Sequence, residues 1–297
     1  MTVVRPAGAT LPGVTHHLTD VAGTRLHHVA AGTAGSPVLL VHGWPETWWA
    51  FRRLIPLLAG THRVHAVDLR GFGDSATAGT ADGADVMTQD LHHLIDHLGL
   101  GPVHLLTQDV SGMLGFRLAA THPDDVLSLT AVESTLPGYG LERLADVAAG
   151  GSWHVGFLGA PGIPSLLLPG RERELLAGWA LPMMNGTPGA VTATDVDEFV
   201  RSFSRPGAWR GTEGLYRSAL ADGATIRTLA GERPLTVPVL TVDGVSAPVT
   251  ASTFRQVSAG DVTSVHVEGV GHLVAQEAPE RLAAALLALA ARVDGSR

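Results

Sequence analysis

VHLLTQDVSG, residues 103–112, decides the fold of this chain. Its apolar start, Val103–Leu106, is typical of a buried parallel strand, and the stretch after it, Gly112–Thr121, has the spacing of a helix. Asp109 therefore sits on a sharp strand-to-helix turn at the edge of a sheet, beside a helix N-terminus. An aspartate there can cap the helix or act as a nucleophile, and this stretch alone does not decide between the two.

Short apolar runs on both sides of this turn predict more strands of the same kind. They alternate with helical stretches, which indicates a parallel sheet covered on both faces. The predicted strands are an antiparallel hairpin over Thr19–Ala31, then Pro37–Val41, His62–Val67, Val103–Leu106, Leu127–Val132, Val237–Val242 and Thr263–Val267. The predicted helices are Trp48–Ala59, Asp85–Leu98, Gly112–Thr121, Thr250–Ser258 and Pro279–Val293. The sequence thus predicts an α/β protein with a mostly parallel, eight-stranded sheet flanked by helices.

The alternation of strands and helices stops between Ser134 and Gly231, where Pro, Gly, Trp and short helical pieces take over. We expect a mostly helical cap in this stretch, inserted after the sixth core strand. The chain then divides into a core of residues 1–133 and 232–297 and a cap of residues 134–231. A chain of 297 residues is long enough to bury such a core.

Composition excludes several classes of function. The net charge of -8 comes without an acidic or basic block, so nucleic acid is not an expected partner. The absence of cysteine excludes disulfides, thiolate metal sites and a cysteine nucleophile. No window of about 18 uncharged apolar residues and no secretory signal are found, so we expect a cytoplasmic protein without a membrane span.

Two further motifs fall where a catalytic aspartate on this turn would need them. HGWP, residues 42–45, directly follows a predicted strand, so its loop reaches the same sheet edge as Asp109. The N–H groups of Trp44 and Val110 would then form an oxyanion hole. GVGHL, residues 269–273, follows the last predicted strand and brings His272 to that edge as well. The order of nucleophile and histidine is that of hydrolases with a catalytic triad.

These motifs resemble the epoxide hydrolase and haloalkane dehalogenase branch of the α/β-hydrolase superfamily, over essentially the whole chain. HGWP, QDVSG at 108–112 and GVGH at 269–272 carry the resemblance. It implies the α/β-hydrolase fold with an inserted helical cap, an aspartate nucleophile, and neither a cofactor nor a metal. Thr107 is a departure, because the residue two positions before the nucleophile is normally glycine.

The resemblance also guides the choice of the acid that orients His272 and stabilises its protonated form. The branch often carries this acid after the seventh strand, in a pattern like GxxDP, where this chain reads GVSAP with Ala247 at the expected place. Asp243, at the end of that strand, could serve as the acid only if the register of the chain differed from the family pattern. Bacterial epoxide hydrolases with the acid after strand six resemble LTAVESTLPG, residues 129–138, and on that likeness we assign Glu133, with Asp243 as the alternative.

Opening an epoxide produces an alkoxide, which leaves poorly unless a positioned acid donates a proton. LYR at 215–217 resembles the Tyr-Arg motif of the branch, which implies Tyr216 as a donor; Tyr139 is the only other tyrosine. The pair Trp153-His154 resembles a Trp-His pair of the same bacterial subgroup, which implies His154 as the second donor. Substrate contacts are expected from His42, Pro45 and Trp153. The aromatic residues near HGWP, namely Trp44, Trp48, Trp49 and Phe51, indicate an apolar substrate, although Trp48 and Trp49 serve equally well as packing.

The sequence therefore predicts an epoxide hydrolase that converts an apolar epoxide and water to a vicinal diol through an ester on Asp109. A dehalogenase shares the same steps, but a haloalkane enzyme usually has Trp where this chain has Val110, and a fluoroacetate enzyme has arginines where this chain has Met113 and Leu114. A non-catalytic member of the fold is the alternative from another class, and Ala247 is its main support. The sequence leaves open the natural epoxide and whether the chain forms a homodimer.

Overall fold

The computed structural model describes residues 1–297 except 22, 78, 80, 81, 245–247 and 297. Its centre is one nine-stranded sheet with the order β1-β2-β3-β5-β4-β6-β7-β8-β9. The strands are β1 Thr2–Val4, β2 Thr15–Val21, β3 Thr24–Ala31, β4 Pro37–Val41, β5 Arg63–Val67, β6 Val103–Gln108, β7 Val126–Val132, β8 Val239–Asp243 and β9 Val262–His266. Every pair from β5 across to β9 is parallel, and the pairs from β1 to β5 are antiparallel. The predicted mostly parallel sheet is confirmed, but it has nine strands instead of eight because Thr2–Val4 pairs with β2.

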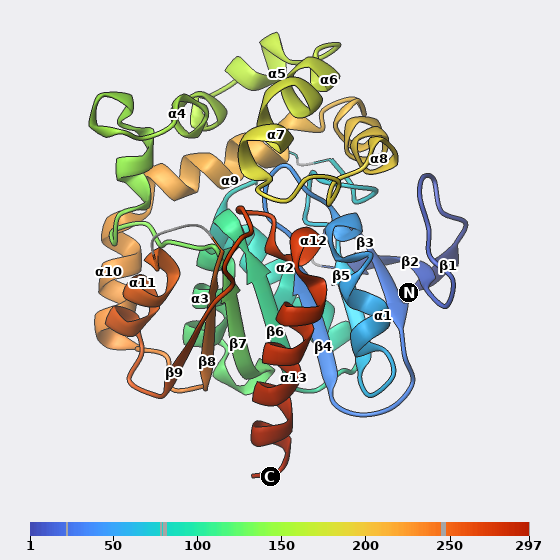
Figure 1. The fold of residues 1–297 in the computed structure, drawn as a ribbon, viewed down its shortest axis with the longest axis vertical. Coiled ribbons are helices and arrows are strands. Elements are labelled where there is room, and N and C mark those ends of the chain that lie inside the picture. Colours follow the sequence, from blue (N-terminus) through green and yellow to red (C-terminus); the bar gives the residue numbers. More distant parts are fainter. Residues whose placement is uncertain (22, 78, 80–81, 245–247, 297) are drawn as a thin grey trace.

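Helices cover both faces of this sheet (Figure 1). On one face α1 (Leu54–Leu58) packs against α13 (Pro279–Asp294), and on the other α2 (Ala84–His97) packs against α3 (Gly112–Thr121). The remaining helices are α10 (Gly223–Glu232), α11 (Val249–Val257) and the short α12 (Val274–Glu277). α11 contacts β8 and β9, and α10, although it falls almost entirely within the stretch predicted as the cap, contacts α3 of the core. Within the described ranges, no helix combines the length and apolarity that a bilayer-spanning segment needs.

Two predicted elements differ from the structure for identifiable reasons. The predicted helix Trp48–Ala59 is a 3-10 turn over Trp48–Phe51 followed by α1. Pro56 has no N–H to donate to the Arg52 carbonyl, so one continuous helix cannot form there. β9 was predicted as a buried strand, but it forms the edge of the sheet and its residues are half-buried or exposed.

The central strands fix the positions of the motifs that the sequence predicts to be catalytic. All residues of β4, β6 and β7 are buried, as expected for strands covered on both faces by helices. The loops that follow these three strands therefore leave from one rigid edge. HGWP follows β4, Asp109 follows β6 and Glu133 follows β7.

A layer of helices lies above the carboxyl ends of these strands (Figure 1). It contains α4 Trp153–Gly159, α5 Ile163–Leu167, α6 Glu172–Leu175, a π-helical turn over Leu176–Ala180, α7 Leu181–Met184, α8 Ala193–Phe203 and α9 Trp209–Ala221. Asp195 of α8 accepts hydrogen bonds from the core residues Arg52, at 2.6 Å, and Trp49, at 2.8 Å. These bonds fasten the helical layer to the core above Asp109.

Three histidines lie side by side on neighbouring strands at the antiparallel end of the sheet. The rings of His17 and His28 are 5.0 Å apart between centroids, and those of His28 and His65 are 5.6 Å apart. Burial, with the neighbouring histidines adding to it, lowers the pKa of His28 to about 2. Burial likewise lowers the pKa of His65 to about 4. These imidazoles stay neutral in the folded protein at a pH that protonates them in the unfolded chain.

We expect the protein to lose stability as the pH falls below about 6.5, the ordinary pKa of histidine. The unfolded chain then binds a proton on His28 that the folded chain binds only near pH 2. This group alone should lower the free energy of unfolding by about 1.4 kcal/mol per pH unit in that window. Urea denaturation between about pH 6.5 and about pH 5 measures this slope. His28→Val should make the slope shallower, while the exposed control His266→Val should not; an equal slope in both variants would contradict the assignment.

Candidate active site

Asp109 lies at the tip of the turn between β6 and α3. Its φ of 56° is a left-handed conformation that is uncommon outside glycine and is found where surrounding contacts enforce it. Ser111 Oγ accepts a hydrogen bond from the Gln108 N–H at 3.1 Å and donates one to the Gln108 carbonyl at 2.7 Å. Gly43 passes so close that a Cβ on it would lie 2.5 Å from the Cβ of Asp109. The turn and the loop after β4 therefore hold this carboxylate in one place.

Thr107, which stands where the family pattern has glycine, is accommodated by a glycine on the facing helix. A Cβ on Gly115 of α3 would lie 2.8 Å from Thr107 Cγ2. Gly115 thus leaves room for the Thr107 side chain, and Asp109 still lies at the tip of the turn.

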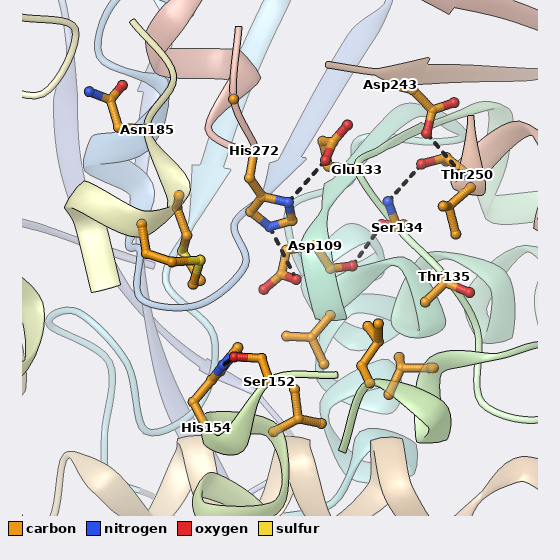
Figure 2. A pocket seen from close by; sticks show the side chains of 18 of the residues that line it. Asp109, Glu133, Ser134, Thr135, Ser152, His154, Asn185, Asp243, Thr250 and His272 are labelled. Atoms are coloured by element: carbon orange, nitrogen blue, oxygen red, sulfur yellow. Dashed lines mark hydrogen bonds and ion pairs between the residues drawn. The ribbon is translucent and has the colours of Figure 1, made fainter. Parts of the chain in front are cut away.

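His272 lies between two carboxylates (Figure 2). Its Nδ1 is 3.1 Å from Glu133 Oε2, and its Nε2 is 3.3 Å from Asp109 Oδ1. Burial lowers the pKa of His272, but the interactions with Asp109 and Glu133 outweigh this effect and raise the pKa to about 10. The imidazole is therefore protonated at neutral pH.

Of the two carboxylates considered for orienting His272, Glu133 makes the contact. Its other oxygen, Oε1, accepts the N–H of Gly244 at 2.5 Å. Glu133 has a φ of 47°, and it shares a positive φ with Asp109 alone among the non-glycine residues that the structure describes. Asp243 instead accepts the N–H of Thr250 at 2.9 Å, at the start of α11. Ala247, at the alternative position for the acid, lies outside the described residues.

The loop after β4 brings the Trp44 N–H to 3.0 Å from Asp109 Oδ2. The two carboxylate oxygens therefore have different neighbours, because Oδ2 faces Trp44 and Oδ1 faces His272. Val110, the second predicted donor of the oxyanion hole, follows Asp109 and lines the cavity. An oxyanion that develops on Oδ2 would meet the main chain of this loop.

His42 and Pro45 are buried within the same loop and are not among the described residues that line the cavity. His42 Nε2 accepts the Leu69 N–H at 3.2 Å, and its Nδ1 donates to the Gly43 carbonyl at 2.8 Å. Both ring nitrogens thus bind the main chain of the loops after β4 and β5. The predicted substrate contacts of His42 and Pro45 are not found in this cavity.

A cavity of about 410 Å³ opens in front of Asp109 and His272. Its apolar lining residues are Val110, Leu141, Leu144, Val155, Met183, Met184 and Val249. Two of the polar lining residues, Ser134 and Thr135, have partners within the protein, whereas the Asn185 side-chain oxygen, also in the lining, has none among the described residues. Ser134 Oγ donates to the Asp109 carbonyl at 2.6 Å, and Thr135 Oγ1 pairs with Thr253 at 3.1 Å. Apart from the catalytic groups, the cavity therefore offers a ligand mainly apolar surface.

Tyr216 of α9 and His154 of α4 line the cavity from the helical layer. In Figure 2, His154 lies on the other side of Asp109 from His272. Burial raises the pKa of Tyr216 well above its ordinary value of 10, so the phenol keeps its proton. Burial lowers the pKa of His154 to about 4, so this imidazole is neutral at pH 7. Both side chains pack against the Trp44 ring, with centroids 5.5 Å away for His154 and 6.0 Å away for Tyr216.

The aromatic residues that were expected to contact substrate lie elsewhere. Trp153 is 44% exposed, packs against Trp179 with a centroid distance of 4.6 Å, and is not among the described lining residues. Trp48, Trp49 and Phe51 are buried in the core and are also outside the described lining. The apolar character of the cavity comes from aliphatic side chains and methionines instead.

Sequence reasoning missed Glu46, which is buried behind the nucleophile turn. It accepts the Gln108 amide at 2.9 Å and the Gln276 amide at 2.7 Å. Burial raises the pKa of Glu46 to about 7. Arg52 donates to Gln276 at 2.8 Å and so extends the chain of polar groups toward the helical layer. The available signal was a charged residue directly after HGWP, in a stretch that is otherwise apolar or aromatic.

One group of three potential metal ligands occurs within the ranges described above, and it lies outside the cavity. It consists of His92, His122 and Asp125. The rings of His92 and His122 stack face to face, with centroids 3.8 Å apart and an interplanar angle of 15°. Nitrogen lone pairs in two parallel rings do not converge on one ion, so these rotamers do not form a metal site.

Comparison with known proteins agrees with this fold. Residues 36–152 match the alpha/beta hydrolase fold family. The soluble epoxide hydrolase of Corynebacterium sp. (strain C12) is 31% identical over 278 residues, which cover 90% of this chain and 94% of that protein. A fluoroacetate dehalogenase of Burkholderia sp. is 31% identical over 217 residues, 69% of each chain. The structure of the epoxide hydrolase CorEH without ligand has a TM-score of 0.82 at 28% identity and covers 94% of this chain and 99% of that one. The chain belongs to the α/β-hydrolase superfamily and, within it, to the epoxide hydrolase branch.

Proposed function

We propose that this protein hydrolyses an apolar epoxide to a vicinal diol through a covalent ester on Asp109. The observation that carries the proposal is the arrangement around this carboxylate. His272 and the Trp44 N–H contact its two oxygens, and Tyr216 and His154 line the same cavity from the helical layer. The names of the relatives described above support an epoxide as the substrate. Residues 134–231, as the proposed cap, would supply both ring-opening donors.

The first half-reaction opens the ring. Asp109 Oδ1 attacks one epoxide carbon, since Oδ2 is held by Trp44, and the bond from that carbon to the ring oxygen breaks. The ring oxygen takes the phenol proton of Tyr216 and becomes a hydroxyl. Ser152 Oγ lies 2.6 Å from His154 Nδ1, and donation from this hydroxyl leaves the ring proton of neutral His154 on Nε2. His154 can then hold the ring oxygen by hydrogen bonding without itself being charged.

The second half-reaction hydrolyses the ester. Ester formation removes the charge of Asp109, one of the two charges that raise the pKa of His272. His272 then releases its proton to solvent, and solvent returns a proton to the Tyr216 phenolate. The neutral His272 imidazole becomes the base that activates water. Water attacks Cγ of the ester, and the oxyanion on Oδ2 is stabilised by the N–H groups of Trp44 and Val110, each worth about 2.7 to 4 kcal/mol. Collapse of this intermediate breaks the Cγ–Oδ1 bond, and the departing alkoxide takes the proton that His272 received from water, which completes the diol. The acid left on Asp109 then returns its proton to His272.

The cavity argues against the dehalogenase alternative. A haloalkane enzyme usually has a tryptophan directly after the nucleophile whose N–H binds the departing halide, and a fluoroacetate enzyme needs arginines that bind the substrate carboxylate. The described lining residues include neither a tryptophan nor an arginine. Met113 and Leu114, which occupy the positions of those arginines, are fully buried in α3.

Tyr216→Phe tests the epoxide assignment, because the ring oxygen of an epoxide must take up a proton as it leaves whereas a departing halide takes up none. We expect diol formation from an aryl epoxide to slow about 100-fold, with His154 providing the remaining assistance. Tyr139→Phe is the matched control, since Tyr139 is the only other tyrosine and lies outside the described lining. Diol and halide release are measured on epoxides and haloalkanes in parallel. Unchanged diol formation in Tyr216→Phe, or halide release without any diol from the wild type, would reject the proposal.

A further inference from the structure

The loop that carries His272 is joined to the helical layer through main-chain contacts. The His272 N–H donates to the carbonyl of Met184, at the end of α7, at 2.7 Å. The two loops approach so closely that a Cβ on Gly271 would lie 2.3 Å from the same carbonyl. A Cβ on Gly186 would lie 2.5 Å from the Gly271 nitrogen. The backbone around His272 therefore rests directly on the loop after α7.

Glu277, the last residue of α12, binds both sides of this contact. Its Oε2 accepts the N–H groups of Gly186 and Gly271, each at 2.8 Å. Its Oε1 accepts the N–H of Leu273 at 3.0 Å. Two of these donors flank His272 in the sequence and the third belongs to the helical layer. Hydrogen bonds to a carboxylate are shorter and stronger than neutral ones, so one side chain fixes both loops.

We propose that Glu277 is a positioning residue for His272. Because Glu277 binds both loops, ester hydrolysis depends on the contact between the loop after α7 and the core. The inference rests on the proposed function, because that function assigns the second half-reaction to His272. Glu277 is outside the described lining of the cavity, and the three hydrogen bonds above all go to main-chain N–H groups. Its effect on chemistry is therefore exerted through the placement of His272.

The two half-reactions should respond differently when Glu277 is altered. Attack by Asp109 uses the Trp44 N–H and the two donors of the helical layer, none of which Glu277 contacts in the bonds given above. Hydrolysis requires His272 Nε2 to hold a water against the ester carbon while Glu133 holds Nδ1. A displacement of about 1 Å in such a group lowers a rate about 100-fold. A purely structural role for Glu277 would instead lower both rates together.

The test compares Glu277→Gln with wild type and with Glu280→Gln, which changes an exposed carboxylate three residues further on. Each protein is mixed rapidly with excess aryl epoxide, quenched, and the ester on Asp109 is quantified by mass spectrometry. For Glu277→Gln we expect ester formation within about twofold of wild type and hydrolysis roughly 10- to 100-fold slower, so that the ester accumulates during turnover. Glu280→Gln should match wild type.

Two results would overturn the proposal: hydrolysis at the wild-type rate in Glu277→Gln, or an equal loss in both half-reactions. Glu277→Asp provides a second variant that keeps the charge but shortens the reach, and it should slow hydrolysis alone by a smaller factor. Equal slowing of both steps in Glu277→Asp counts against the proposal as well. Failure of the proposed function is a different result, because the wild type would then form neither ester nor diol.

Discussion

Asp109→Asn should form no detectable diol from any epoxide, with a rate at least about 10⁴-fold below wild type. The amide is nearly isosteric and can still accept the Trp44 N–H, so the turn between β6 and α3 should keep its shape. The amide oxygen carries no negative charge, however, and is a poor nucleophile toward an epoxide carbon. Loss of activity would therefore report the loss of the nucleophile.

This measurement is diol production from aryl and alkyl epoxides, with the thermal midpoint checked for each variant. Asp124→Asn is the control, because Asp124 is an exposed carboxylate on the turn before β7. It should keep wild-type activity. Diol formation by Asp109→Asn at a rate near that of wild type would show that water attacks the epoxide directly, without an ester.

His272→Gln should separate the two half-reactions. Asp109 keeps its charge and its contact with Trp44, so the ring still opens and an ester forms. Of the other groups in the described lining, the carboxylates Glu133 and Asp243 are engaged by other residues. The remaining imidazole, His154, has its Nδ1 bound to Ser152, and burial lowers its pKa to about 4, so it is a poor base for the water beside Asp109. We expect multiple turnover to fall roughly 10³- to 10⁴-fold while the first ester forms in a single rapid phase.

Rapid-quench kinetics give both rates for His272→Gln in one experiment. The exposed residue His266 offers the control His266→Gln, which should behave like wild type. Sustained turnover by His272→Gln would assign the base to another residue. A failure of the first phase would place His272 in ring opening and would contradict the order of steps proposed above.

Sequence patterns locate residues well when the pattern is tied to a strand. Asp109 directly follows the buried strand β6, and His272 lies in the loop after β9, the last strand. Because parallel strands end at a common edge, their proximity could be predicted, and the structure places them 3.3 Å apart. Glu133 was assigned from the family resemblance, and it lies 3.1 Å from His272. Periodicity did not detect β1, because a strand of three residues is too short to show alternation.

The direction of a side chain on a helix or loop was harder to predict. Trp153 and His154 are neighbours on α4, so they point about 100° apart around the helix axis, and only His154 lines the cavity. His42 and Pro45 belong to a catalytic motif, yet they lie within the loop and not on its cavity side. Membership of a motif therefore does not establish contact with substrate.

Residues that act through long-range contacts gave the weakest signal. Glu46 and Gln276 are separated by 230 positions in the sequence but lie 2.7 Å apart. Glu277 meets Gly186 from 91 positions away. Such pairs depend on how the helical layer docks on the core, which hydrophobic periodicity and local motifs do not encode.

The most direct test of the central claim is the intact mass of His272→Gln after brief incubation with an aryl epoxide, followed by peptide mapping. The covalent mechanism predicts a mass increase equal to one epoxide molecule, located on the peptide that contains Asp109 and absent from the double variant Asp109→Asn/His272→Gln. An unmodified protein with every epoxide and haloalkane tested would contradict the proposed ester and, with it, the assignment of Asp109 as the nucleophile.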